Sequence, residues 1–339
     1  MRTPTVEGIT SASALEQTGE SIAALQLRSG MIEWFPGGHA DPWNHVESAM
    51  ALSTVGRTVE AEAAYQWLLD VQRPDGSWHN YYLADSVEDP KIDVNCVAYV
   101  ATGAWHHYLS TKDIGFAETM FPAVDRAIDC VLDLQTRRGE ILWARTADGV
   151  PWSYALLTGS ASISHSLRCA IDLAELLGCE RPSWHDARTR LIDAVAGVPS
   201  AFEPKDRWAM DWYYPVLTGA ITGDDGAKRL VARWDEFVMP GQGVRCVADR
   251  PWVTAAETCE CAIALLAAGD RRSALDLFRW TQFHRTDDGG YDTGIVYPEE
   301  ARFPDQEQSS YTAAAVILAA DALDGSNPTS TLFTTHAPR

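Results

Sequence analysis

The chain has 339 residues, 46% of them hydrophobic, and 47 Asp and Glu residues against 27 Lys and Arg residues give it a formal net charge of -20 at pH 7. This charge would repel phosphates over most of the surface, so we expect no nucleic-acid partner and no membrane partner. The N-terminus lacks the basic and then apolar run of a signal peptide, and no apolar stretch is long enough to cross a bilayer. Seven cysteines, without the CxxC spacing of zinc sites, indicate buried thiols in a reducing compartment. We therefore expect a cytoplasmic protein.

Periodic apolar patterns predict twelve helices joined by loops of unequal length. In chain order they cover residues 10–28, 42–55, 58–72, 94–110, 116–135, 161–177, 184–197, 210–221, 225–238, 254–268, 271–284 and 310–323. Candidate N-caps are Asp41, Asp93, Ser160 or Ser162, and Thr254, the last in a capping box with Glu257. Candidate helix-ending glycines are Gly56, Gly178 and Gly269.

A short turn recurs after four of these helices. It reads QLRSGMIEW at 26–34, QRPDGSW at 72–78, QTRRGEILW at 135–143 and QFHRTDDGGY at 282–291. Each copy has a glutamine, a charged turn that contains glycine, and a closing aromatic residue. A repeat of this kind indicates one supersecondary unit copied several times.

The helices alternate in character. VAYVATGAWHHYL (97–109) and TCECAIALLAAG (258–269) are small or apolar on nearly every face, whereas EAEAAYQWLLDVQ (60–72) is amphipathic. Helices that are apolar all round belong inside and amphipathic ones outside. We therefore predict an all-α fold, an (α/α)6 toroid of six hairpins that forms a single catalytic domain over 1–325, with a flexible C-terminal tail over 326–339. The long loops and the N-termini of the inner helices should meet at one mouth, where function is expected.

Several carboxylates stand in the predicted mouth. Glu47 and Glu260 each follow a helix cap by six residues, among small and apolar residues, which is a costly position for an acid unless it is paired or used. Glu257 and Glu260 share one helix face, where repulsion could raise one pKa and keep a proton available. Asp41 and Glu257 could equally be no more than helix caps. The candidate catalytic residues are Asp41, Glu47, Glu257 and Glu260; Asp211, Glu299 and Glu300 are interpreted as substrate-binding or solvated acids.

Most of the thirteen tryptophans lie in or beside the mouth loops. The three that end repeated turns, Trp34, Trp78 and Trp143, suit a packing role. Aromatic residues in mid-loop beside polar and acidic residues suit sugar binding; they are Trp43, Trp152, Trp212, Tyr213 and Trp252. The candidate substrate-binding residues are Trp43, His45, Trp78, Asp211, Tyr213 and Trp252. The histidines show no spacing that demands a metal, so no metal or organic cofactor is expected.

The QRPDGSW turn resembles the Q-x-x-x-G-x-W element of triterpene cyclases and protein prenyltransferases. The chain has no DxDD or DDxxD motif, however, and the Asp93 and Cys96 pair has no evident His partner for zinc. This resemblance therefore supports the ring and not the prenyl chemistry.

A second resemblance covers more of the chain. The order of GGHADPWNHVE (37–47), LLTGSASISHSL (156–167) and GGYDTGIVYPEE (289–300) is similar to that of six-hairpin glycosidases. Within that group the chain most resembles the methylmannose polysaccharide hydrolases, endo-acting α-mannosidases that cut an intracellular α-(1→4)-mannan. The resemblance implies two carboxylates over a sugar-lined cleft and a mannan-like polysaccharide as substrate.

Glycoside hydrolysis needs a protonated carboxyl beside the leaving oxygen and a second carboxylate, which activates water from about 6.5–9.5 Å away or attacks directly from about 5–5.5 Å. The resemblance to toroid glycosidases implies the inverting arrangement, and we expect one acid from Asp41 or Glu47 and the other from Glu257 or Glu260. Two alternatives stay open at this point: a non-catalytic toroid that binds carbohydrate or lipid, and an enzyme of the terpene cyclase or prenyltransferase type.

Overall fold

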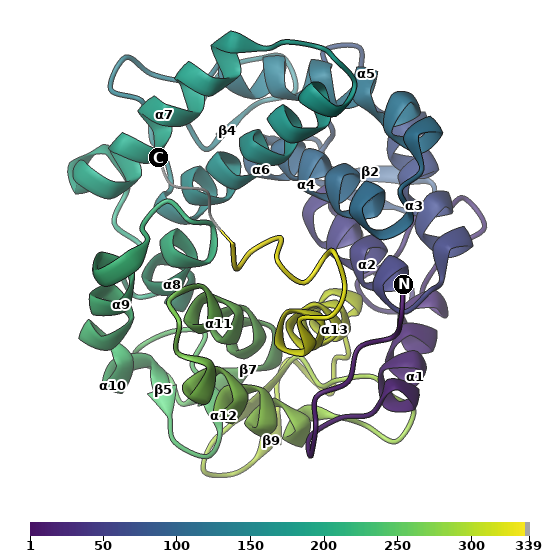
Figure 1. Ribbon diagram of the computed structural model, residues 1–339, viewed down its shortest axis with the longest axis vertical. Coiled ribbons are helices and arrows are strands. Elements are labelled where there is room, and N and C mark those ends of the chain that lie inside the picture. Colours follow the sequence, from purple (N-terminus) through teal and green to yellow (C-terminus); the bar gives the residue numbers. More distant parts are fainter. Residues whose placement is uncertain (336–339) are drawn as a thin grey trace.

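The computed structural model describes residues 1–335, which form a closed double ring of helices (Figure 1). Each inner helix packs against the next, and the last packs against the first and closes the ring. The inner helices are α2 (Pro42–Thr54), α4 (Val94–Thr111), α6 (Leu157–Leu176), α8 (Ala209–Leu217), α11 (Ala255–Ala267) and α13 (Ser310–Asp324). Most of their residues are buried, as expected for helices with small or apolar side chains on nearly every face.

The outer wall has one helix for each inner helix. Its members are α1 (Ala12–Ala23), α3 (Thr58–Val71), α5 (Ile114–Leu132), α7 (Pro182–Gly197), α9 (Gly223–Ala232) with the one-turn α10 (Trp234–Phe237), and α12 (Arg271–Thr281). Five of them pack on the inner helix that precedes them, whereas α1 packs on α13 from the other end of the chain. The predicted (α/α)6 toroid is confirmed. The predicted helix over 225–238 is divided instead, because Arg233 leaves helical geometry with φ -125° and ψ 17°.

Short antiparallel strands and two 3-10 turns lie in the connections. The strand pairs are β1 (Tyr81–Leu83) with β2 (Ser86–Asp89), β3 (Ile92–Asp93) with β4 (Ala144–Arg145), and β5 (Val238–Met239) with β6 (Gly243–Val244). A three-stranded sheet has the order β7 (Trp252–Thr254), β8 (Gly294–Val296), β9 (Ala301–Arg302), and the 3-10 turns are η1 (Pro199–Ala201) and η2 (Gln282–His284). The β3–β4 and β7–β8 pairs each join two successive long loops, so they fix the wall of the mouth.

Three of the four repeated turns fasten one outer helix to the next, whereas Gln282 of the fourth copy donates to the carbonyl oxygen of Phe278 in its own helix. Gln72 Nε2 donates to the carbonyl oxygen of Gly76 in its own turn, at 3.0 Å, and to that of Ala123 on α5, at 2.9 Å. Gly76 has φ +82°, and a Cβ added there would lie 2.3 Å from the carbonyl oxygen of Arg126. The glutamines of the first and third copies make the same pair of bonds. The repeat is therefore architectural, as its copy number suggested.

Replacing Gln72 with alanine should lower the free energy of unfolding by about 1–3 kcal/mol, because two carbonyl oxygens lose their donor. Urea unfolding of the purified variant measures the change. Gln66→Ala is the matched control, since Gln66 donates only to the side chain of Asp70 at an exposed position. Equal losses for the two variants would contradict the fastening role of the turn.

The predicted helix ends are partly confirmed. Asp41 and Asp93 cap α2 and α4 through their side chains, and Gly56, Gly178 and Gly269 have φ between +68° and +86° just after their helices. Ser160 and Ser162 are not caps, because α6 already begins at Leu157. Thr254 is the N-cap residue of α11 as predicted, but the capping box is wrong, since its side chain makes no capping bond and its hydroxyl has no partner in the described part of the chain.

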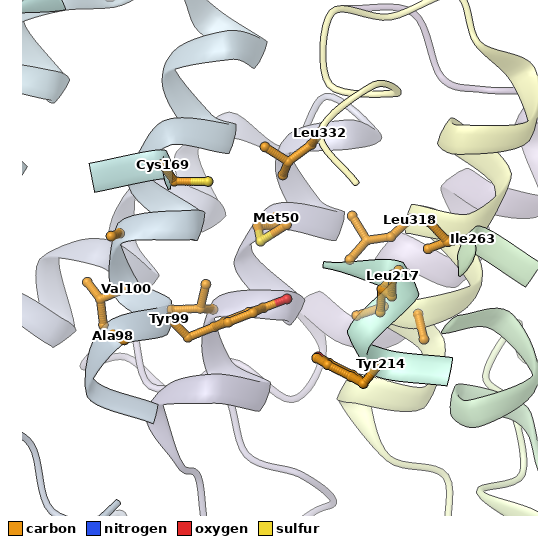
Figure 2. Close-up of a cluster of buried hydrophobic side chains, with 14 of the residues drawn as sticks. Met50, Ala98, Tyr99, Val100, Cys169, Tyr214, Leu217, Ile263, Leu318 and Leu332 are labelled. Atoms are coloured by element: carbon orange, nitrogen blue, oxygen red, sulfur yellow. The ribbon is translucent and has the colours of Figure 1, made fainter. Parts of the chain in front are cut away.

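Residues 326–335 cross the centre of the ring, as the yellow segment of Figure 1 shows. Leu332 is 3% exposed within the main hydrophobic cluster, where Figure 2 draws it above Met50 and opposite Cys169. Asp321 of α13 accepts from Asn327 Nδ2 at 2.7 Å and from Thr329 Oγ1 at 2.6 Å. The sequence predicted a flexible tail over 326–339, but residues 326–335 are packed into the ring; residues 336–339 lie outside the described residues. No helix within 1–335 has the length and apolar character to span a bilayer.

Candidate active site

The N-termini of the inner helices bring the four candidate acids to one mouth. Asp41 precedes α2, and Glu47 lies in the second turn of that helix. Glu257 and Glu260 lie in the first and second turns of α11. Since α2 and α11 both pack against α13, the two pairs of acids approach the mouth from either side of that helix.

Asp41 is a complete helix cap. Its Oδ1 accepts from the backbone N–H groups of Trp43, at 2.9 Å, and Asn44, at 3.1 Å. Its Oδ2 accepts from Trp34 Nε1, at 2.7 Å, and Asn44 Nδ2, at 2.8 Å. Burial raises the pKa of Asp41 although these donors oppose the shift. With both oxygens engaged, this carboxylate holds the start of α2 and the Trp34 ring, and it has little capacity left for a substrate.

Glu47 is a buried acid poised to titrate near neutrality. Its Oε1 accepts from Trp43 Nε1 at 2.9 Å and from the Tyr99 hydroxyl at 3.1 Å. Burial raises the pKa of Glu47 to about 7, the two donors oppose the shift, and the nearby Asp41 carboxylate adds to it. An acid of this kind can exchange a proton at working pH.

Glu260 is the acid with the stronger tendency to keep its proton. Burial raises its pKa well above the usual range, and repulsion by Glu47 and Glu257 adds to the shift. The Tyr213 hydroxyl donates to Oε2, and the side chain is only half-buried, so it retains access from the mouth. Glu47 and Glu260 are thus close enough to affect each other's ionisation.

Two tyrosines lie between these acids. The phenol pKa values of Tyr99 on α4 and Tyr214 on α8 are raised by burial and by both Glu47 and Glu260. Figure 2 shows that the phenol rings of Tyr99 and Tyr214 come from different helices and point toward the centre of the toroid. The indole of Trp43 lies 5.6 Å from the Tyr99 ring and 5.8 Å from the Tyr214 ring, measured between centroids. The acids therefore share an aromatic floor.

Glu257 has no capping partner, because the predicted box with Thr254 does not form. Its side chain is half-buried in the first turn of α11, beside the thiol of Cys246. Burial raises the pKa of Cys246, and the Glu257 carboxylate adds to that shift. Glu257 is thus available to a ligand in the mouth, in a position where the helix dipole favours its negative charge.

Glu47→Gln is expected to make the protein more stable at pH 8 by about 3 kcal/mol and to leave its stability at pH 4 unchanged. Below the unfolded pKa of 4.5 the glutamate is protonated in both states, and above the folded pKa of about 7 the folded state carries the full cost of a buried charge. Urea unfolding at the two pH values measures the difference, with Glu16→Gln on an exposed helix face as the control. A stability difference independent of pH would contradict the raised pKa.

Three predicted substrate contacts lie at the mouth. Trp43 is half-buried beside Glu47. Asp211, in the first turn of α8, is 8% exposed and accepts from the Thr158 hydroxyl at 2.6 Å. Trp252 on β7 is half-buried, and its Nε1 donates to the carbonyl oxygen of Phe303 at 3.1 Å. These side chains can meet a ligand.

The other three predicted contacts are not brought to the mouth surface. His45 is 1% exposed, with its ring nitrogens bonded to the backbone of Ile32 and Ala64, and burial lowers its pKa to about 4. Trp78 is also 1% exposed and donates to the carbonyl oxygen of Leu68, so it is a packing residue. Tyr213 is fully buried and reaches the site only through its bond to Glu260.

Sequence reasoning missed some of the residues that shape the site. Trp34 and Trp143, interpreted as packing residues, donate from Nε1 to the capping carboxylates Asp41 and Asp93. Tyr99 was not singled out, because it lies in a helix of mostly apolar residues. Its phenol hydroxyl, a polar group in such a helix, could have indicated a role at the site. Within residues 1–335, no group of three or more His, Cys, Asp or Glu side chains is arranged to hold a metal ion.

Comparison with known proteins supports a sugar-processing enzyme. No family model matches the chain. The MMP endo-(1,4)-3-O-methyl-α-D-mannosidase of Mycolicibacterium hassiacum is 50% identical over 330 residues, which cover 97% of this chain and 91% of that relative. This relationship is close enough and long enough to define a family.

Solved structures share the ring at much lower identity. A glycosidase in complex with glucose has a TM-score of 0.73 at 15% identity, covering 94% of this chain and 99% of its own. A GH63 mannosylglycerate hydrolase from Thermus thermophilus has 0.68 at 12%, covering 90% and 99%, and a D-mannose isomerase has 0.67 at 11%, covering 93% and 99%. Because an isomerase shares the ring, the fold alone does not select hydrolysis. The 50% identity does: this chain is a glycoside hydrolase and belongs to the MMP endo-(1,4)-3-O-methyl-α-D-mannosidase family.

Proposed function

We propose that this protein cuts α-(1→4) bonds inside a 3-O-methylmannose polysaccharide, and that the cut is made at the mouth of the ring by Glu260 and Glu47. The observation that carries the proposal is a pair of neighbouring carboxyls, buried Glu47 on α2 and half-buried Glu260 on α11, of which Glu47 raises the pKa of Glu260, in a chain half identical to an enzyme of that activity. Family membership also sets aside the two earlier alternatives, a binding toroid and a terpene cyclase.

The surroundings of the two acids assign their roles. Two donors stabilise ionised Glu47, whereas Glu260 has one donor and two repelling carboxylates, so the proton of the pair resides on Glu260. Pairs whose environments separate their pKa values divide into acid and base. Glu260 therefore gives its proton to the glycosidic oxygen as the bond from that oxygen to the anomeric carbon breaks. Glu47 takes a proton from the attacking water on Oε2, the oxygen that neither donor engages.

The remaining mouth residues bind and orient the sugar. Trp43 offers an aromatic face beside the base, and Asp211 and Glu257 accept hydrogen bonds from sugar hydroxyls. Asp41 acts through structure, since it fixes the helix start that carries both Trp43 and Glu47.

Incubation with an α-(1→4)-linked 3-O-methylmannose oligosaccharide tests the proposal. Shorter products from internal cleavage are expected, and proton NMR of the first turnovers should show the β-anomer, as inversion requires. A β-(1→4)-mannan of equal length is the control and should stay intact. Absence of shorter products would overturn the function, and the α-anomer as first product would overturn the role of Glu47 as base.

A further inference from the structure

A cavity of 720 Å³ lies outside the ring centre, between α1 and the start of α13. It forms where the two ends of the chain meet, since α1 packs mainly on α13, the last helix of the chain. Its walls include Ser21 of α1, Phe35 of the first mouth loop and Ala313 of α13. A volume of this size is typical of small-molecule sites.

The loop that carries Trp34 and Phe35 borders both the candidate active site and the cavity. Trp34 donates to Asp41 on the mouth side, and its ring lies 4.9 Å from that of Tyr311, the second residue of α13. The next residue, Phe35, lines the cavity, and the backbone N–H of Ser310 donates to the carbonyl oxygen of Trp34 at 2.8 Å. Trp34 and the start of α13 therefore border both the mouth and this cavity.

The lining combines apolar walls with an acidic rim. The apolar members include Ala24, Leu25, Phe35, Pro36, Pro304 and Ala313. The charged members are all acids, namely Glu20, Asp288, Asp305 and Glu307. Anionic ligands are therefore disfavoured, whereas neutral hydroxyl groups find acceptors at the rim and a methyl group finds apolar surface inside.

One backbone position in the lining is unusual. Gln306 has φ +59°, in the left-handed region that non-glycine residues seldom adopt. Such positions concentrate at ligand sites, because the surrounding structure must hold them there. Gln308, two residues further along the chain, lines the cavity too, and its Oε1 lies 3.4 Å from the Thr286 hydroxyl, which donates to Asp288 at 2.5 Å.

We propose that this cavity is an outer subsite that reads the methyl ether of a 3-O-methylmannose unit in the same chain that is cut at the mouth. The inference rests on the proposed function. A methyl ether cannot donate a hydrogen bond and adds apolar area, so it gains from the apolar walls where a free hydroxyl would lose a partner. An outer subsite also suits internal cleavage, because the polymer then extends beyond the cleaved bond.

The test compares two α-(1→4)-mannose oligosaccharides of equal length, one 3-O-methylated and one not. Burial of one methyl group corresponds to about a fourfold preference in kcat/KM for the methylated substrate. Ser21→Leu fills the cavity from α1 and should remove this preference by raising KM for the methylated substrate, with kcat unchanged. Ser13→Leu is the matched control, because Ser13 is an exposed residue of α1 outside the cavity.

The outcomes separate the subsite from the activity. If Ser21→Leu keeps the wild-type preference, or the wild type cuts both substrates equally well, the subsite is overturned while the hydrolase stands. If the wild type cuts neither substrate, the proposed function fails. Phe35→Ala supplies a second variant that removes one wall, and it should also reduce the preference without lowering turnover of the unmethylated substrate.

Discussion

Glu260→Gln is expected to lower kcat on the methylated oligosaccharide by about 10²–10⁴-fold, the range that a positioned general acid contributes. Glutamine keeps the shape of the side chain and can still meet the Tyr213 hydroxyl, but it has no proton to give to the leaving oxygen. Initial rates under substrate saturation measure the loss, and circular dichroism and urea unfolding show that the variant is folded.

The same assay distinguishes the carboxylates from one another. Glu47→Gln should cause a comparable loss, because the attacking water loses its base. Asp41→Asn should lose less activity than Glu260→Gln, since the asparagine Oδ1 still caps α2 and only the bonds from Trp34 Nε1 and Asn44 Nδ2 are given up. A folded Asp41→Asn protein as inactive as Glu260→Gln would transfer the role of base from Glu47 to Asp41.

Tyr213→Phe tests the role of Glu260 as acid through a change in the pH dependence of kcat, and not through a loss of activity. The Tyr213 hydroxyl stabilises ionised Glu260, so its removal raises the pKa of Glu260 further. Because activity falls when the acid loses its proton, the alkaline limb of the kcat profile should move to higher pH. Tyr311→Phe is the control, as the Tyr311 phenol lies on α13 and Glu257 is the carboxylate that contributes most to its raised pKa.

The fold was predictable because its helices repeat at a regular period. Helix α2 is predicted at 42–55 and found at Pro42–Thr54, and α13 is predicted at 310–323 and found at Ser310–Asp324. The position of Glu47 and Glu260 at the mouth was predictable too, since both are charges in the second turn of otherwise apolar inner helices. The pattern of apolar and charged residues along the chain was thus enough to predict most helices and the acids at the mouth.

The sequence pattern could not show which side chains from different inner helices meet across the toroid. His45 and Glu47 are two residues apart, and a helix turns about 100° per residue, so the two side chains point to opposite faces. Only Glu47 meets Tyr99 of α4, a contact between residues 52 positions apart. The packing of Leu332 had no local signal either, because Leu332 and Phe333 are only two apolar residues among serine and threonine residues, a pattern typical of a loop.

Leu332→Ala should lower the free energy of unfolding by about 2–5 kcal/mol, the cost of a cavity in a core. Leu332 is 3% exposed in the cluster that contains Met50 and Leu318, and its carbonyl oxygen accepts from Arg168 Nη2 at 2.5 Å, which fixes its position. Urea unfolding measures the change. Thr331→Ala is the matched control, because its side chain is exposed one residue away.

Removal of residues 326–339 should lower the pKa of Glu47 as well as the stability of the protein. Without the segment, Asp321 loses the donors from Asn327 and Thr329, and water can enter the ring from the side opposite the mouth. Burial is the largest cause of the raised pKa of Glu47, so hydration of the aromatic floor lowers that pKa. The acidic limb of the activity profile should therefore move to lower pH. An unchanged acidic limb in a folded truncated protein would mean that water does not enter the mouth when the C-terminal segment is absent. If the truncated chain does not fold, Leu332→Ala supplies the same test with a smaller shift of the acidic limb.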